Sequence, residues 1–439
     1  MEKPDKINRA AVLSLLLARV IYAINWFNIA SIFPHIASDF KQDVSLLGLL
    51  TTSFLIGVGL FQVPGGILAA IQGSRRTAIY GITISSSAAL LCGLSSQLQQ
   101  MEILRFVVGL GMALFFGPSV TLITRYLGRG SEGLAVGLLN SAHSIGGIIG
   151  LFGWVILAEV VGWRQSLLLS GGLGLISSLV LIALLPRKEE EGQRQPQQSS
   201  QQTGGRSLEI KMSDIRKVLF DKSLFAFGLV LLGAQIAWGL PLTFIVFYLE
   251  DYLKVNSSMA GFIASVGLIC GLVSAPVFGR IYDKIRNIKK LLFVCGLAMS
   301  TGVAGIAITN ASSGVYVVGI SNAVVGVFSA GVFTIAYTSA KEAYRKSRSE
   351  ANIETTITKR SIKMNHVQFS YDTLAISWVN GLSLFGAFWI PIVFSFVVHH
   401  LGYSIAWLLG GIFSLLFILP SLGITVYKTA YKGKSSRRS

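Results

Sequence analysis

One short pattern occurs twice in this chain, each time between two long apolar segments. The first copy is GILAAIQGSRR at residues 66–76, and the second is GRIYDKIRNIKK at residues 279–290. Each copy begins with a glycine at an expected helix end and finishes with two basic residues, and a proline, Pro64 or Pro276, precedes each. A basic hairpin at the same place in two halves of an apolar chain implies a duplicated bundle of membrane helices.

The composition is that of a protein whose surface faces lipid. Of the 439 residues, 52% are hydrophobic and 13% are charged, whereas a soluble domain carries roughly 25% charged residues. Apolar runs of about 20 residues predict membrane-spanning helices. We expect twelve such spans in an all-α fold, near residues 10–33, 45–71, 77–96, 101–127, 133–161, 165–185, 224–248, 257–281, 290–309, 313–339, 373–398 and 401–427.

The net charge of +17 is placed on one side of the predicted membrane. With the N-terminus in the cytoplasm, the outside loops hold only three of the 37 Lys and Arg residues, and two more, Arg19 and Arg105, lie within spans. The others lie in inside segments, which is the positive-inside distribution. It predicts a multi-pass protein of the cell membrane with both termini cytoplasmic, and it assigns the basic charge to the lipid bilayer and not to nucleic acid.

Two polar regions interrupt the apolar rhythm and divide the chain. The predicted division is an N-terminal six-helix bundle (1–186), a Gln- and Ser-rich cytoplasmic linker (187–222), a C-terminal bundle (223–428) with a cytoplasmic insertion at 341–372, and a basic tail (429–439). The end of the linker, from Ser207 to Lys222, is expected to form a short surface helix. The insertion is expected to be solvated and partly helical, with a regulatory or lipid-contacting role as the alternative.

The sequence contains no recognisable motif for catalysis or for binding a cofactor. Cys92, Cys270 and Cys295 all fall inside spans, so neither a disulfide framework nor a metal site is expected. The chain has no phosphate-binding loop and no nucleophilic triad. We therefore predict that it is not an enzyme and that it has no cofactor.

The doubled hairpin resembles the signature of the major facilitator superfamily, G-x-x-x-D-[RK]-x-G-x-[RK]-[RK]. The first copy keeps the glycines and the basic pair but has Ala70 and Ile71 in place of Asp and Arg, and the second keeps Asp but has Arg286 where the second Gly would stand. The resemblance implies a monomeric secondary transporter of two six-helix bundles that works by alternating access. It also implies a conformational gate of Gly66, Gly73, Arg75, Arg76, Gly279, Asp283, Lys284, Lys289 and Lys290.

Arg19 is the first candidate for substrate binding. It lies ten residues into the first span, about 15 Å deep at 1.5 Å per residue, and Tyr22 and Trp26 share its face. An uncompensated Arg at that depth costs at least ~2.5 kcal/mol, so it needs a wet cavity, an acidic partner or an anionic substrate. The alternative is that its side chain extends to the cytoplasmic headgroups.

Other polar or aromatic residues within spans are candidates by the same reasoning. For several of them a packing role is an equally good interpretation, and for His143 a hydrogen-bonded packing role competes with proton transfer. Arg105 also belongs to an R-x-x-x-G pattern that resembles the superfamily's fourth span. The predicted substrate-binding residues are Arg19, Tyr22, Arg105, Asn140, His143, Gln235, Asn322 and Trp378.

These residues predict uptake of a small organic or inorganic anion, coupled to a proton or another ion. The fifth span lacks the G-P-x-x-G-G motif of drug antiporters in the superfamily, and some features of the second span resemble organic-anion symporters. Two alternatives stay open: export of an apolar or cationic compound, and a membrane sensor that does not transport. The sequence does not identify the substrate.

Overall fold

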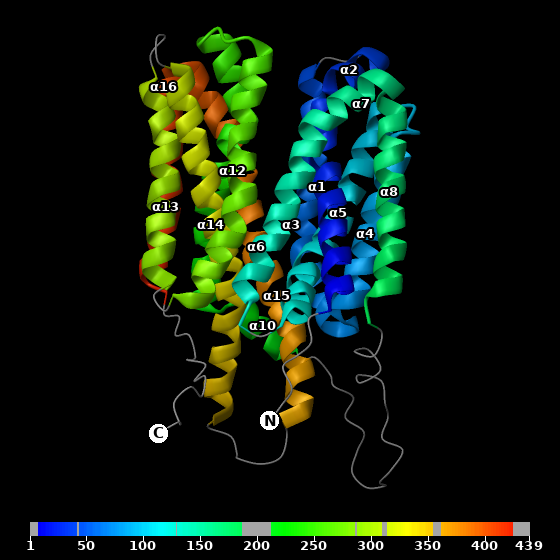
Figure 1. Ribbon diagram of the computed structural model, residues 1–439, viewed down its shortest axis with the longest axis vertical. Coiled ribbons are helices and arrows are strands. Elements are labelled where there is room, and N and C mark those ends of the chain that lie inside the picture. The colour runs from blue at the N-terminus through cyan, green and yellow to red at the C-terminus, as the bar shows by residue number, and fades with distance from the viewer. Residues whose placement is uncertain are drawn as a thin grey trace, which may run out of the picture.

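The computed structural model describes residues 8–41, 44–128, 130–186, 212–285, 288–309, 314–353 and 361–424. Every regular element in these ranges is helical, and the helices form two bundles that stand side by side (Figure 1). The first bundle contains α1 (Arg9–Ser31), α2 (Phe33–Phe40), α3 (Val44–Gln72), α4 (Ser74–Cys92), α5 (Leu98–Leu127), α6 (Glu132–Ile148), η1 (Ile149–Gly153), α7 (Trp154–Val161) and α8 (Trp163–Leu184).

The second bundle repeats this arrangement. It contains α10 (Met212–Leu219), α11 (Lys222–Phe247), η2 (Tyr248–Tyr252), α12 (Ser257–Lys284), α13 (Ile288–Gly305), η3 (Ile306–Ile308), α14 (Gly314–Ile353), α15 (Ser361–Ala387), α16 (Ile390–Ile418) and η4 (Leu419–Leu422). We call the end of the molecule where α1 begins and α10 lies the α10 end, and the opposite end, where α2 and α7 lie, the α2 end (Figure 1).

The predicted twelve membrane-spanning helices are confirmed. Ten described segments are long and apolar enough to cross a membrane, and one of them, Asp372–Leu422, has 51 residues. That segment is long enough to cross twice, and Gly402, with φ 84° and ψ 169°, breaks α16 within it. The twelfth span is α4, which packs along α5 and α8 and is less apolar because of three consecutive serines, 85–87.

Glycines bring the helices of each bundle into close contact. A Cβ at Gly109 in α5 would lie 2.2 Å from the carbonyl oxygen of Phe54 in α3, and one at Gly326 in α14 would lie 2.1 Å from that of Gly267 in α12. Only glycine allows backbones to approach this closely, which is how membrane helices gain packing energy without a hydrophobic effect between them.

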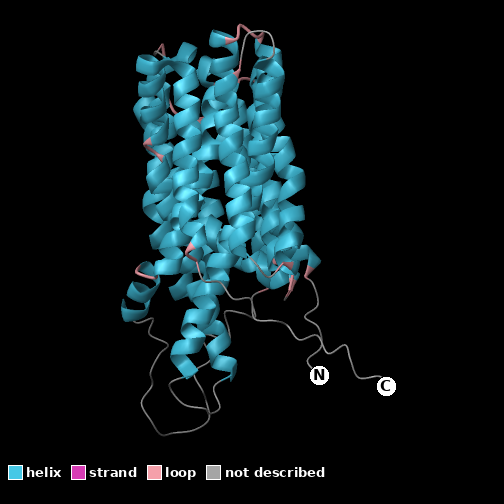
Figure 2. Cartoon of the chain, turned by 90° about the vertical axis from the view of Figure 1, so that its left-hand side faces the viewer, coloured by secondary structure: helices cyan, strands magenta, loops and turns pink. Residues whose placement is uncertain are grey.

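The polar regions of the sequence are partly described. The helix α10 lies within the segment expected to form a surface helix, and its Val218 is buried near α11 and α15. In the insertion, α14 continues to Ile353 and α15 starts at Ser361, so both helices project beyond the bundle (Figures 1 and 2). The linker residues 187–211, residues 354–360 and the tail 429–439 lie outside the described residues, and the predicted domain boundaries stay predictions.

Candidate functional site

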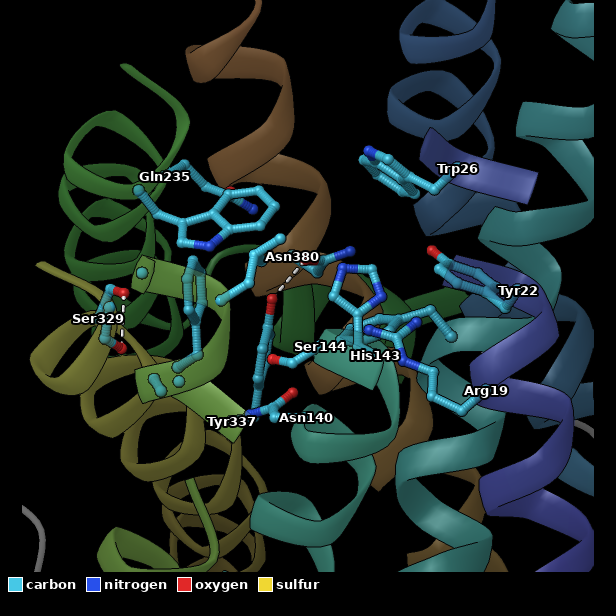
Figure 3. A pocket seen from close by; sticks show the side chains of 18 of the residues that line it. Arg19, Tyr22, Trp26, Asn140, His143, Ser144, Gln235, Ser329, Tyr337 and Asn380 are labelled. Atoms are coloured by element: carbon cyan, nitrogen blue, oxygen red, sulfur yellow. Dashed lines mark hydrogen bonds between the residues drawn. The ribbon is translucent and has the colours of Figure 1, made fainter. Parts of the chain in front are cut away.

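A cavity lies between the two bundles, about midway along them. The space between its walls, including its open mouth, is about 730 Å³. Its walls come from α1, α5 and α6 on one side and from α11, α12, α14 and α15 on the other. The polar side chains in it are those of Arg19, Tyr22, Asn140, His143, Ser144, Gln235, Ser329, Tyr337 and Asn380 (Figure 3).

Arg19 supplies the positive charge of this cavity. Its side chain is 5% exposed, and its guanidinium lies 4.3 Å from the ring centroid of Tyr22 and 4.9 Å from that of Phe116. Nε and Nη1 have no hydrogen-bond partner among the described residues, and none of the residues that line the cavity is Asp or Glu. This buried position does not fit an Arg that extends to the headgroups.

The aromatic contacts of Arg19 do not compensate its burial. A cation over an aromatic face gains about 0.5 to 2 kcal/mol. The effective cost of removing an ion from water is several kcal/mol. The cavity therefore has an excess of positive charge and two unused donors, and an anion would satisfy both.

The walls around Arg19 are aromatic. His143 on α6 stands between rings from both bundles, with ring centroids 6.0 Å from Tyr22, 6.1 Å from Trp26 and 6.3 Å from Trp238. Its Nδ1 has no hydrogen-bond partner in the described part of the chain. In Figure 3 the Arg19 side chain extends toward His143.

Hydrogen bonds hold part of the polar lining in place. Tyr337 donates its hydroxyl to Oδ1 of Asn380 over 2.6 Å, and Asn140 donates from Nδ2 to the hydroxyl of Thr334 over 3.1 Å. The second of these bonds joins α6 to α14, which belong to different bundles. Asn140, which lines the cavity, is thus also part of the contact between the bundles.

Three predicted site residues, Arg105, Asn322 and Trp378, lie outside the lining of this cavity. Arg105 is 2% exposed, donates from Nη1 to the carbonyl of Asn25 over 3.0 Å and covers Phe54, so it packs inside the first bundle. Asn322 donates to the carbonyl oxygens of Ile263 and Ala264 and ties α14 to α12. Trp378 is not part of the cavity wall.

The other predicted residues, Arg19, Tyr22, Asn140, His143 and Gln235, do come together at the cavity. The sequence analysis missed Ser144, Ser329, Tyr337 and Asn380. Each is a polar residue in an apolar span, the same pattern that identified Asn140 and His143. Tyr337 and Asn380 are hydrogen-bonded to each other although they lie 43 residues apart in the sequence. The sequence gives no sign of this pairing.

At the α10 end, one contact between the bundles is made by α6 and α12. The carboxylate of Asp283 accepts hydrogen bonds from the backbone N–H groups of Gly133 (2.9 Å) and Leu134 (3.1 Å), at the start of α6. The two helices touch here, since a Cβ at Gly279 would lie 2.3 Å from the carbonyl oxygen of Gly133. The acid of the second hairpin therefore caps a helix of the other bundle.

The second contact at this end joins α3, α4 and α5 to α14 and α15, and it is made through hydroxyl groups. The Thr373 hydroxyl lies 2.9 Å from that of Ser74 and donates to that of Thr121 over 2.8 Å. Lys341 donates from Nζ to the Thr124 hydroxyl. A Cβ at Gly66 would lie 2.8 Å from Cβ of Ser377, so this glycine also permits close approach of the bundles.

The remaining residues of the predicted gate lie in the two hairpins. Gly73, with φ 97°, makes the turn from α3 to α4, a conformation that favours glycine. Arg75 donates from Nε to the Leu185 carbonyl and from Nη2 to the Ile182 carbonyl, both over 3.0 Å, and so holds the end of α8 within its own bundle. Arg76 lies in the first turn of α4, Lys284 ends α12, and Lys289 and Lys290 begin α13.

Comparisons with known proteins agree with this architecture. A family profile described as Major Facilitator Superfamily matches residues 15–353. The D-galactonate transporter of Escherichia coli O6:H1 is 24% identical over 333 residues, 70% of this chain and 76% of the relative. The riboflavin transporter RibZ of Clostridioides difficile is 23% identical over 322 residues, 65% of this chain and 70% of the relative.

Among solved structures, the transporter FucP in its outward conformation superposes with a TM-score of 0.66 at 13% identity, covering 95% of this chain and 100% of FucP. At that identity the likeness shows the fold alone. The two curated relatives carry different solutes, so the substrate has to be argued from the cavity.

Proposed function

The chain belongs to the major facilitator superfamily, and on that premise we propose that it takes up a small organic anion by alternating access, coupled to a proton or another ion. The observation that carries this proposal is Arg19, a buried cation with two unpartnered nitrogens in a cavity whose lining holds no carboxylate. An anion would supply the charge and the acceptors that the described residues do not.

The shape and lining of the cavity support an organic anion over an inorganic one. Rings of Trp26, Trp238, Phe116 and Phe333 face the space beside Arg19, and an apolar or planar body would cover them. A small inorganic ion would leave most of this surface in contact with water. That the D-galactonate transporter is a relative supports an organic acid.

Alternating access requires the contacts at the α10 end to open. If this end faces the cytoplasm, as the positive-inside distribution predicts, the bonds of Asp283 and Thr373 close the cytoplasmic side in the described state. The described state would then be the one closed on the cytoplasmic side, from which a cycle of uptake would start. A single chain holds the whole cavity, so a monomer suffices.

Export of a cationic compound is the weaker alternative. A cation would be repelled by Arg19 and would find no carboxylate in the described lining. A sensor that does not transport would use the same cavity, and only a flux measurement separates it from a transporter.

The test is uptake into proteoliposomes that contain the purified protein. Labelled probes are first chosen by a thermal-shift screen of small carboxylates, inorganic anions, sugars and amines, because a ligand of the folded state raises apparent stability. We expect Arg19→Gln to lose uptake at low anion concentration by roughly 10- to 150-fold, the value of a charged hydrogen bond. Arg19→Lys should retain part of it.

The matched control is Arg9→Gln, which removes an exposed cation from the start of the same helix. It should leave uptake unchanged. Uptake of unaltered affinity in Arg19→Gln, with normal amounts of folded protein, would contradict the role of Arg19. Stabilisation by amines and not by anions would favour the export alternative.

A further inference from the structure

We infer that this protein is an anion exchanger, in which one bound anion crosses inward and another crosses outward, and in which the empty protein does not complete the cycle at a comparable rate. The inference rests on the proposed function and specifies its coupling ion. The counter-ion would be a second anion leaving through the same cavity. Its basis is the electrostatic balance around Arg19.

The first step is that Arg19 has no internal counter-charge. The titratable side chains facing it are Tyr22 on its own helix, His143 on α6 and Tyr337 on α14. None of the three is an anion at neutral pH in its ordinary form. His143 can add positive charge but cannot remove any.

The second step concerns the described carboxylates, which lie toward the two ends of the bundles. Asp283 is bonded to the start of α6 at the α10 end, and Asp39 pairs with Arg164 at the α2 end over 2.8 Å. The other acids whose side chains the structure describes are Glu102, Glu132, Glu159, Asp221, Glu250, Glu342 and Asp372, and none of them lines the cavity. No described acid can therefore alternate between binding a proton and neutralising Arg19.

The third step follows from alternating access itself. Between its two open states the cavity must be closed at both ends, and water leaves it. With an anion bound, Arg19 is paired during this step. Without one, a buried cation with two unused donors must cross the closed state unpaired, and such a group is costly in a medium of low polarity. The loaded protein should therefore cross more easily than the empty one.

A transporter coupled to a proton by a carboxylate would behave differently. Its acid could lose a proton after the substrate had left and then neutralise the arginine for the return step. None of the residues that line the cavity is an acid that could neutralise Arg19 in this way. Exchange, in which the return step is made with a second anion bound, needs no such group.

The experiment measures uptake of a labelled probe anion into proteoliposomes loaded with the same unlabelled anion or with buffer only. The probes are benzoate and D-gluconate, an aromatic and a polyhydroxylated monocarboxylate. Exchange predicts that internal anion accelerates initial uptake by at least about tenfold, with little effect of an imposed pH gradient. Arg19→Lys, which keeps the charge, should keep this dependence on internal anion.

Saturable uptake at equal rates with and without internal anion would overturn exchange and leave the proposed function standing. Absence of saturable uptake of either probe under both conditions would count against both proposals. A second readout needs no substrate. In single-molecule fluorescence with labels at Leu184→Cys and Phe220→Cys, both exposed near the α10 end, the empty wild-type protein should switch between states at least about tenfold more slowly than Arg19→Gln.

Arg9→Gln serves as the control and should switch like the wild type. If the empty wild-type protein switches as fast as Arg19→Gln, the charge of Arg19 does not limit the empty return step and the inference is wrong, whatever the transport assay shows about uptake.

Discussion

The two contacts that close the α10 end differ in chemistry although they occupy equivalent places in the two halves. The contact of α6 with α12 uses a carboxylate, since Asp283 accepts from two backbone amides of the opposite bundle. The contact of α3 with α15 has no acid in its hairpin, where Ala70 stands instead, and the neighbouring bonds include those of the Thr373 hydroxyl and of the Lys341 ammonium. Bonds to a charged group are about twice as strong as neutral ones.

This difference indicates that the closed state depends unequally on its two contacts. A charge at a helix terminus contributes typically 0.3–1 kcal/mol, and up to ~2 kcal/mol when partly buried. Each neutral hydroxyl bond contributes about 0.5–1.5 kcal/mol net, and many hydroxyls can rebond to water when the bundles part. The contact without an acid therefore relies on bonds such as those of Thr373 and Lys341, whereas Asp283 is accompanied on its own side by the Ser141 hydroxyl, which donates to the Leu272 carbonyl over 2.6 Å.

The largest effect is expected from closing the space at Gly279. Its Cβ would lie 2.3 Å from a backbone oxygen of Gly133, which cannot move without shifting α6, whereas the Cβ of Gly66 would lie farther from its neighbours, 2.8 Å from Cβ of Ser377 and 3.1 Å from Cα of Leu374. Overpacking costs about 1–3 kcal/mol, so Gly279→Ala should disfavour the closed contact by roughly 5- to 150-fold. Gly66→Ala should have a smaller effect.

The measurement is the distance distribution between spin labels at Leu184→Cys and Phe220→Cys, in a background where Cys92, Cys270 and Cys295 are replaced by Ser. Ser377→Gly should reverse part of the effect of Gly66→Ala, because it removes Cβ and Oγ of Ser377 and leaves Cα of Leu374 in place. Equal shifts for the two alanine variants would mean that the contacts are equally rigid and would remove the asymmetry argued here.

The second prediction removes the charge alone. Asp283→Asn keeps the size of the side chain but weakens the cap on α6, so the population with the α10 end open should rise by roughly 2- to 30-fold. Turnover should fall more than substrate affinity, because Asp283 lies away from the cavity. The same spin-label pair measures the shift. An unchanged distance distribution would mean that the hairpin only fixes the orientation of the chain in the membrane.

Much of this architecture is predictable from the sequence, because the signals that identify it lie within short segments of the chain. A membrane helix is recognised by the apolar character of some twenty consecutive residues. The structure breaks α16 at Gly402, next to the predicted boundary between the spans 373–398 and 401–427. The resemblance identifies Asp283 as a gate residue, and acids favour helix N-termini. The two backbone N–H groups that it binds, those of Gly133 and Leu134, are identified by the structure.

The cavity was predictable only in part for the same reason. Arg19 and Arg105 give the same pattern, a cation within an apolar span, yet one faces the cavity and the other packs against Asn25 inside its bundle. The direction that a helix presents to its neighbours depends on how the whole bundle packs. A single polar residue in a span therefore indicates burial with a partner, and only the structure shows whether that partner is protein or cavity.

The smallest effect is expected from restoring the acid to the first hairpin with Ala70→Asp and Ile71→Arg. Ile71 is 63% exposed, so the new Arg would lie at the surface, where an ion pair contributes about 0–1 kcal/mol. Ala70 is buried near the contact, and an Asp there could accept from the backbone or hydroxyl groups of α15. We expect the closed α10 end to gain at most about fivefold in population, opposite in sign to Asp283→Asn.

Combined with Asp283→Asn in one chain, the double substitution should restore part of the wild-type distance distribution if the contacts act in parallel. If the combined variant resembles Asp283→Asn alone, the two contacts are not interchangeable, and the hydroxyl contact has a role that a carboxylate cannot fill.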